Sequence, residues 1–175
     1  MNRIPIPNPT PLGDDRLFLS GGYGEGSTII QVSRDNDHWS VTETRDIPDY
    51  GSQIHPALLH DQNLYVNLNE DDAMKRGLAC LDLNGDILWQ THTSPSIGRG
   101  NLIIADAMVI SMGGGDGMLR LIQTDPSEYK ELTAAVIFSN LKDNDNQIWA
   151  AMALSNGKLV VRNQNEMVCL DLVNP

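Results

Sequence analysis

The chain has 175 residues, of which 41% are hydrophobic and 20% are charged, a balance typical of a folded globular protein. Its 12 basic and 23 acidic residues give a net charge of −11, which repels the phosphate backbone of nucleic acids and the surface of anionic membranes. We therefore expect no nucleic-acid partner. No apolar run approaches the roughly 20 residues of a membrane helix, so no membrane span is predicted.

The N-terminal segment and the cysteines say little about the cellular compartment. The first nine residues contain three prolines and no apolar segment of signal-peptide length, so we expect no signal peptide in this chain. Cys80 and Cys169 lie far apart and lack the spacing of metal ligands. The cysteines therefore predict neither a disulfide framework nor a metal site, and the compartment stays open.

A polar turn followed by a β-rich apolar run recurs four times along the chain. The copies begin at Leu12, Leu59, Ile104 and Leu154, at spacings of 47, 45 and 50 residues. Each copy predicts a β-hairpin, because the Asp, Asn or Gly residues at its centre favour tight turns. A second apolar run follows each hairpin. In the first two copies, a third run rich in β-branched or aromatic residues comes next.

Four strands every 40 to 50 residues or so are typical of a β-propeller blade. We therefore predict an all-β fold, a β-propeller of about four blades, each a four-stranded antiparallel sheet. The chain is predicted to form a single domain, with blades at roughly 3–46, 50–92, 97–138 and 147–172.

Two parts of the chain fit this repeat less well. Apolar residues within 127–138 also fit a helical period, and we assign an outer strand there because the repeat phase places one. The fourth blade ends after its third strand. Propellers have about four to eight blades and protect their edges by closing, so we predict a partial or half propeller. Self-association of two such halves into one ring is a further hypothesis.

The segment 79–89 resembles the tryptophan-docking repeat of pyrroloquinoline-quinone-like (PQQ-like) propellers. Cys80, Asp82, Gly85 and Trp89 stand at the matching positions, but this copy is one residue shorter and has Asn84 where the family usually has threonine. Other copies keep only part of the motif, such as Trp39 in the first blade and Asp171 in the fourth. Longer stretches, at 7–9, 18–27, 98–106, 129–132 and 161–172, also look like bacterial quinone-like repeat proteins.

This resemblance implies a function as well as a fold. Relatives of this kind are commonly exported or periplasmic bacterial proteins, and many bind no quinone. We therefore expect a non-catalytic binding or scaffold module for a protein or small-molecule ligand. The alternative is a PQQ-dependent alcohol dehydrogenase of the polyvinyl-alcohol type, or a fragment of one. That enzyme needs PQQ, calcium and a catalytic aspartate, and the sequence assigns residues to none of them.

The repeat residues have structural roles in this interpretation. Trp39 and Trp89 are expected to fill the seams between neighbouring blades, where the indole N–H needs a hydrogen-bond partner. Asp82 and Asp171 are expected to accept hydrogen bonds from turn amides. Gly85 is expected at the tight turn, where a Cβ atom is unfavourable.

Ligands of propellers usually meet the loops at one mouth of the central channel. The residues at the start of the four inner strands are therefore our candidates for ligand contact: Asn8, His55, Arg99 and Trp149. Arg99 lies between two glycines and suits an anionic group. Trp149 precedes a predicted inner strand at 150–153. Simple solvation of the mouth is the competing interpretation for all four.

Other polar or glycine-rich motifs predict no chemistry. The glycine-rich stretches 21–26 and 113–117 lack the lysine and the following helix of a phosphate-binding loop. The acidic clusters 35–37, 69–72 and 143–145 do not complete a calcium-binding loop. The four histidines have no ligand spacing, so no metal site and no catalytic residue is predicted.

Overall fold

A computed structural model of the chain describes residues 6–48, 50–69, 77–95, 97–139, 141 and 147–173. Every regular element in these ranges is a β-strand, so the prediction of an all-β fold is confirmed. None of the described residues belongs to a helix that could cross a bilayer.

The strands form four separate antiparallel sheets, each running in chain order. Sheet 1 contains β1 (Thr10–Gly13), β2 (Arg16–Ser20), β3 (Ser27–Asp35) and β4 (His38–Ile47). Sheet 2 contains β5 (Leu58–His60), β6 (Asn63–Leu68), β7 (Gly77–Asp82) and β8 (Ile87–Gln90). Sheet 3 contains β9 (Asn101–Ala105), β10 (Met108–Met112), β11 (Met118–Gln123) and β12 (Glu131–Val136). Sheet 4 contains β13 (Ala153–Ser155), β14 (Lys158–Arg162) and β15 (Met167–Asp171).

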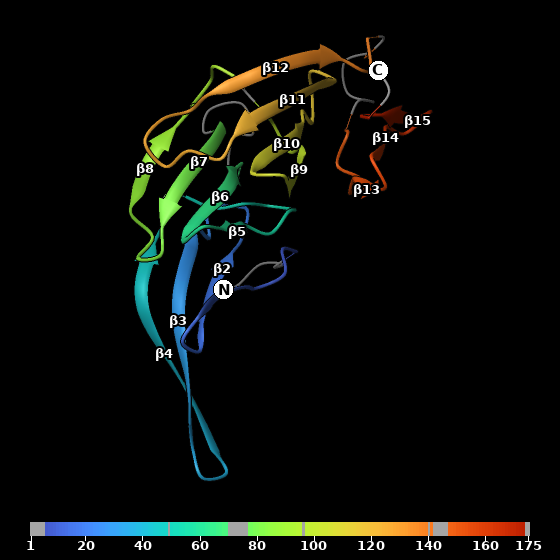
Figure 1. Cartoon of the computed structure of the whole chain (residues 1–175). Coiled ribbons are helices and arrows are strands. Elements are labelled where there is room, and N and C mark those ends of the chain that lie inside the picture. The colour runs from blue at the N-terminus through green and yellow to red at the C-terminus, as the bar shows by residue number, and fades with distance from the viewer. Residues whose placement is uncertain are drawn as a thin grey trace.

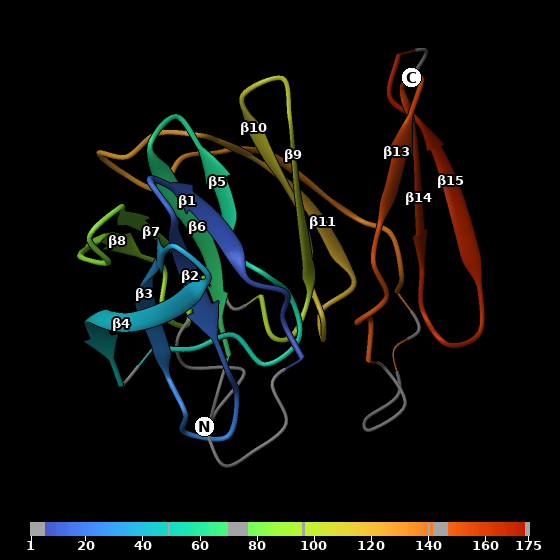
Figure 2. The ribbon, with the colours of Figure 1, turned by 90° about the horizontal axis from the view of Figure 1, so that it is seen from below.

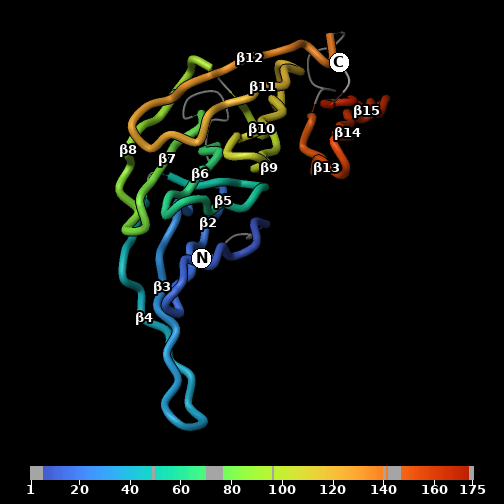
Figure 3. The backbone as a smooth tube through the Cα atoms, viewed as in Figure 1, coloured from blue at the N-terminus to red at the C-terminus, as the bar shows by residue number. Residues whose placement is uncertain are grey.

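The four sheets follow one another along an open arc (Figure 1). The first strands of sheets 1, 2 and 3 are neighbours, because β1 contacts β5 and β5 contacts β9. The strands β4, β8 and β12 lie on the outer side of the arc (Figure 1). Sheet 4 stands at the opposite end of the row from sheet 1 (Figure 2). The β3–β4 hairpin extends beyond the rest of the chain (Figure 3).

The first hairpin of every sheet turns in two residues that both have positive φ. This geometry is that of the type I′ turn, whose twist matches that of the flanking strands. The turn residues are Asp14 and Asp15, Asp61 and Gln62, Asp106 and Ala107, and Asn156 and Gly157. The polar-turn repeat in the sequence therefore marks the same structural position four times.

Two sequence assignments in the second half of the chain have different outcomes. The stretch 127–138 contains the strand β12, which pairs with β11, so the helical alternative is wrong there. The inner strand expected at 150–153 instead begins at Ala153. Met152 is buried in the core between sheets 3 and 4, and its N–H lies 3.3 Å from the Asn101 side chain. These contacts hold the preceding segment as coil against sheet 3.

The hydrophobic core is divided into three seams, one between each pair of consecutive sheets. Sheets 1 and 2 bury Phe18 and Leu64 in the first seam. Tyr65 of sheet 2 meets Val109 of sheet 3 in the second. Ile110 of sheet 3 belongs to the third, whose other wall is sheet 4. Adjacent residues of β6 and of β10 thus face opposite seams, as the alternation of side chains along a strand requires. Each inner sheet therefore buries both of its faces.

Substitution of a seam residue tests this division of the core. Leu64→Ala removes a fully buried side chain and should lower the free energy of unfolding by about 2–5 kcal/mol. Leu59→Ala, at the exposed neighbouring position on β5, is the matched control and should change it by about 0.5 kcal/mol or less. Urea unfolding at one fixed protein concentration measures both values. Equal losses in the two variants would contradict the seam model.

Candidate functional site

The predicted channel-mouth residues all lie in the coil segments that precede the first strand of each sheet. Three of them, His55, Arg99 and Trp149, form one cluster across sheets 2, 3 and 4. Asn8 is exposed, and none of the hydrogen bonds and ring contacts that join this cluster involves it. We call the coil segment before the first strand of each sheet its lead-in, and we call these three residues, with Gln53 and Asn101, the lead-in cluster.

His55 connects the lead-in of sheet 2 to β9 of sheet 3. The Asn101 amide nitrogen lies 2.8 Å from His55 Nδ1, so the amide donates and Nε2 carries the ring proton. His55 is only 8% exposed, and Nε2 makes no hydrogen bond of good geometry to the described residues. Burial lowers the pKa of His55, and the Trp149 carbonyl opposes this shift. The imidazole is therefore neutral near pH 7.

Arg99 connects the lead-ins of sheets 2, 3 and 4. Its Nε donates to the side-chain oxygen of Gln53, and its guanidinium carbon lies 5.5 Å from the centre of the Trp149 ring. This distance is within the range of a cation–π contact. One face of the indole is thus covered by a charged group of the chain itself.

Two buried asparagines, one on β6 and one directly after it, extend the same network by donating hydrogen bonds to the backbone of the segment before β9. Asn67 donates to the Gly100 carbonyl at 2.8 Å, and Asn69 donates to the Gly98 carbonyl at 3.3 Å. The Asn69 side-chain oxygen accepts from the Gln53 N–H at 2.8 Å. A Cβ atom at Gly100 would collide with the Met112 carbonyl, so glycine is required at this approach.

None of the amides of this network is a candidate site residue in the sequence. Gln53 and Asn67 belong to no motif, whereas Asn69 opens the acidic cluster 69–72 and Asn101 lies in the stretch 98–106. Only the fold connects these amides across consecutive sheets. A usable signal was present, because asparagine is unfavourable inside strands and β6 carries one at Asn67.

The two repeat tryptophans have different environments. The Trp89 ring lies between those of Tyr65 (6.1 Å) and Tyr129 (5.7 Å), and its N–H donates to the Asp125 carbonyl at 2.7 Å. Trp89 therefore lies in the seam between sheets 2 and 3. Trp39 is 67% exposed on the β3–β4 hairpin, where Arg34 lies over its ring. The expectation that Trp39 fills a seam between neighbouring sheets of this chain is wrong, because this hairpin extends beyond the rest of the chain (Figure 3).

The turn before Trp89 is held by Asp82. Its Oδ1 accepts the N–H groups of Asn84 and Asp86 at 2.8 and 2.9 Å. Burial opposes ionisation, but these hydrogen bonds outweigh it and hold the pKa of Asp82 below its ordinary value. Gly85 has a φ of 84° in the same turn. In sheet 4, Asp171 accepts the Val173 N–H at 3.1 Å.

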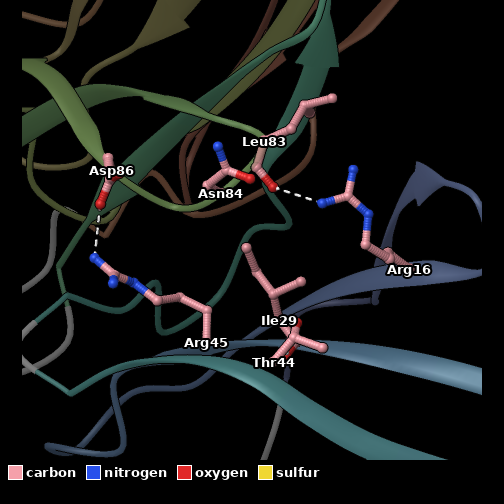
Figure 4. Close-up of a pocket in the computed structure, with 7 residues that line it drawn as sticks. All are labelled: Arg16, Ile29, Thr44, Arg45, Leu83, Asn84 and Asp86. Atoms are coloured by element: carbon pink, nitrogen blue, oxygen red, sulfur yellow. Dashed lines mark hydrogen bonds and ion pairs between the residues drawn. The ribbon is translucent and has the colours of Figure 1, made fainter.

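A cavity of about 270 Å³ lies at the seam between sheets 1 and 2 (Figure 4). Arg16 donates to the Leu83 carbonyl at 3.1 Å, and Arg45 pairs with Asp86 at 2.7 Å. Both arginines thus bridge the two sheets across the cavity. The arrangement could admit a small polar molecule, but it presents no nucleophile beside a general base.

The described residues do not fit the cofactors that the family resemblance implies. No three acidic, histidine or cysteine side chains converge within the part of the chain that the structure describes. Asp35 and Asp37 are exposed at the β3–β4 turn, and Asp37 pairs with Arg34 at 3.4 Å. The acidic residues 70–72 and 143–145 lie outside the described residues. Arg99 covers one face of the Trp149 ring, so that face is not open for a quinone to stack on.

Comparisons with known proteins give no family for this chain. No protein-family model and no curated protein matches it. One solved structure, described as "KlHsv2 with loop 6CD replaced by a Gly-Ser linker", matches 95% of this chain and 47% of that chain, with 10% identity and a TM-score of 0.49. The chain thus spans about half the length of that protein, and the likeness carries no argument about function.

Trp89 should stabilise the seam both by packing and by its hydrogen bond. Trp89→Ala should cost about 3 kcal/mol of unfolding free energy, the lower end for a large aromatic because the ring is partly exposed. Trp89→Phe should cost about 1 kcal/mol, because it removes the bond to Asp125. Urea titration is the measurement. Leu88→Ala, at the exposed position beside it, is the control that should change little.

The buried histidine should make stability depend on pH. The folded-state pKa of His55 lies below the unfolded value, so the stability it contributes is complete above about pH 6.5 and is lost as the pH falls below that value. Unfolding free energies measured from pH 7.5 to 5.5 should decline more steeply for the wild type than for His55→Gln. The exposed His38→Gln variant should keep the wild-type slope. Identical slopes for wild type and His55→Gln would refute this.

Proposed function

We propose that the four sheets are consecutive blades of a PQQ-like β-propeller that this chain leaves open, and that the protein is a non-catalytic binding or scaffold module. One observation carries the proposal. At three of the four mouth positions the side chain connects one sheet to another, as in the contacts of His55 with Asn101 and of Arg99 with Gln53 and Trp149. Side chains that join two sheets in this way stabilise the arrangement of the sheets, as a scaffold requires.

The arrangement of the sheets supports the propeller part of the proposal. Consecutive meanders with neighbouring first strands are the pattern of propeller blades. Trp89 joins its own sheet to the following one, as the tryptophan-docking repeat implies. The turn held by Asp82 and Gly85 precedes it, as in that repeat, although this copy is one residue shorter.

The uncovered surfaces support the binding part. Large apolar side chains are exposed on strands at both ends of the arc, among them Trp39, Val41 and Met167. Such side chains are typical of protein interfaces when they gather on one face. We therefore infer a protein partner for the end sheets.

Assay with quinone tests the non-catalytic part directly. The purified chain is incubated with PQQ and calcium chloride, and dye-linked oxidation of primary alcohols and of polyvinyl alcohol is followed by absorbance. We expect no turnover above the rate of the cofactor alone and no saturable change in the quinone spectrum. Turnover proportional to protein concentration would instead identify a quinone-dependent dehydrogenase and refute the scaffold proposal.

A further inference from the structure

Within the described residues, no other sheet packs on one face of sheet 1 or on one face of sheet 4, at the two ends of the arc (Figures 1 and 2). The register places one set of side chains on the outward face of sheet 1, which we call the first end face. Its apolar members are Leu17, Leu19, Ile30, Val32, Trp39 and Val41. The corresponding second end face belongs to sheet 4. Its apolar members are Ala153, Val160, Met167 and Cys169.

The repeat shows what these faces are built to contact. Leu17 is the second residue after its two-residue turn, as are Leu64, Val109 and Leu159 in the other sheets. Those three are fully buried against the preceding sheet. The first end face therefore has the position and chemistry of a seam whose preceding sheet is missing.

The second end face corresponds to the opposite half of a seam. Val160 is the third residue after its turn, the position of Phe18, Tyr65 and Ile110. Those three are buried against the following sheet. The face is thus a seam whose following sheet is missing, and the two end faces are complementary halves of one seam.

Charge on the two faces is complementary as well. The strands of the first end face carry Glu43 and Asp46 beside Arg34, which leaves one negative charge in excess. The second carries Lys158 and Arg162 beside Asp171, which leaves one positive charge in excess. In a chain of net charge −11, a locally basic face favours contact with an acidic face of another molecule.

We propose that a second copy of this chain covers both faces. The first end face of each copy packs on the second end face of the other, so two identical seams close a two-fold ring of eight sheets. This inference rests on the proposed function, because it requires the sheets to be propeller blades. Closure follows because each copy supplies one half of each seam, and a two-fold axis then leaves no end face free.

The first test compares matched variants on exposed valines. Val41 is 63% exposed on the first end face, and Val136 is 58% exposed on the outer strand β12, away from both end faces. Sedimentation equilibrium of the wild type should give twice the chain mass of 19.2 kDa. Val41→Arg should weaken dimerisation about tenfold or more, whereas Val136→Arg should leave it unchanged. Circular dichroism should show that both variants fold.

The second test exchanges charge between the faces. A chain with Glu43→Lys and Asp46→Lys, and another with Lys158→Glu and Arg162→Glu, should each dimerise about tenfold more weakly. An equimolar mixture should recover the dimer, because one seam of the mixed ring is wild type and the other has both charges reversed. Recovery in the mixture is not expected for non-specific association.

Each outcome has a defined meaning. A wild-type monomer with normal seam stability would overturn the dimer while leaving the scaffold proposal intact. Open polymers that grow with concentration would overturn closure. A dimer that ignores the Lys158 and Arg162 changes would place the contact elsewhere and also overturn the inference. Quinone turnover by a dimer that shows the predicted effects of these substitutions would refute the proposed function. It would not refute the proposal that a second copy covers the end faces.

Discussion

The seam between consecutive sheets is the contact on which the rest of this structure depends. Side chains alternate along each strand, so neighbouring residues of β6, such as Leu64 and Tyr65, enter the cores on opposite sides of sheet 2. No sheet has a core of its own. Each sheet is stable only where a neighbouring sheet covers it. An open arc therefore leaves the end faces of sheets 1 and 4 exposed.

Polar side chains also connect different sheets, at the inner side of the arc. His55 with Asn101, and Arg99 with Gln53 and Trp149, join different sheets and leave the apolar seams undisturbed. Buried polar groups of this kind fix relative placement more than they add stability, because each must first lose its water. His55, Arg99 and Trp149, the candidates for ligand contact in the sequence, thus connect neighbouring sheets in the structure.

Sequence alone predicted the strands, the four hairpins and the three-stranded last sheet, because turn residues and β-rich runs are local signals. It also singled out Trp89, which lies in the best-preserved copy of the motif. It was wrong on Trp39 and on the start of β13, since both depend on what lies beside the chain: an extended hairpin in one case and the Asn101 contact in the other. The amide network was missed because residues such as Gln53 and Asn67 are placed by the fold and by no spacing in the sequence.

The central claim is that equivalent seams continue around a closed ring that needs a second copy. Small-angle X-ray scattering of the wild-type chain tests it most directly. The account predicts the pair-distance distribution of a compact ring with twice the chain mass of 19.2 kDa, independent of concentration above the dissociation constant. A profile that fits one open arc of four sheets at every concentration would contradict it.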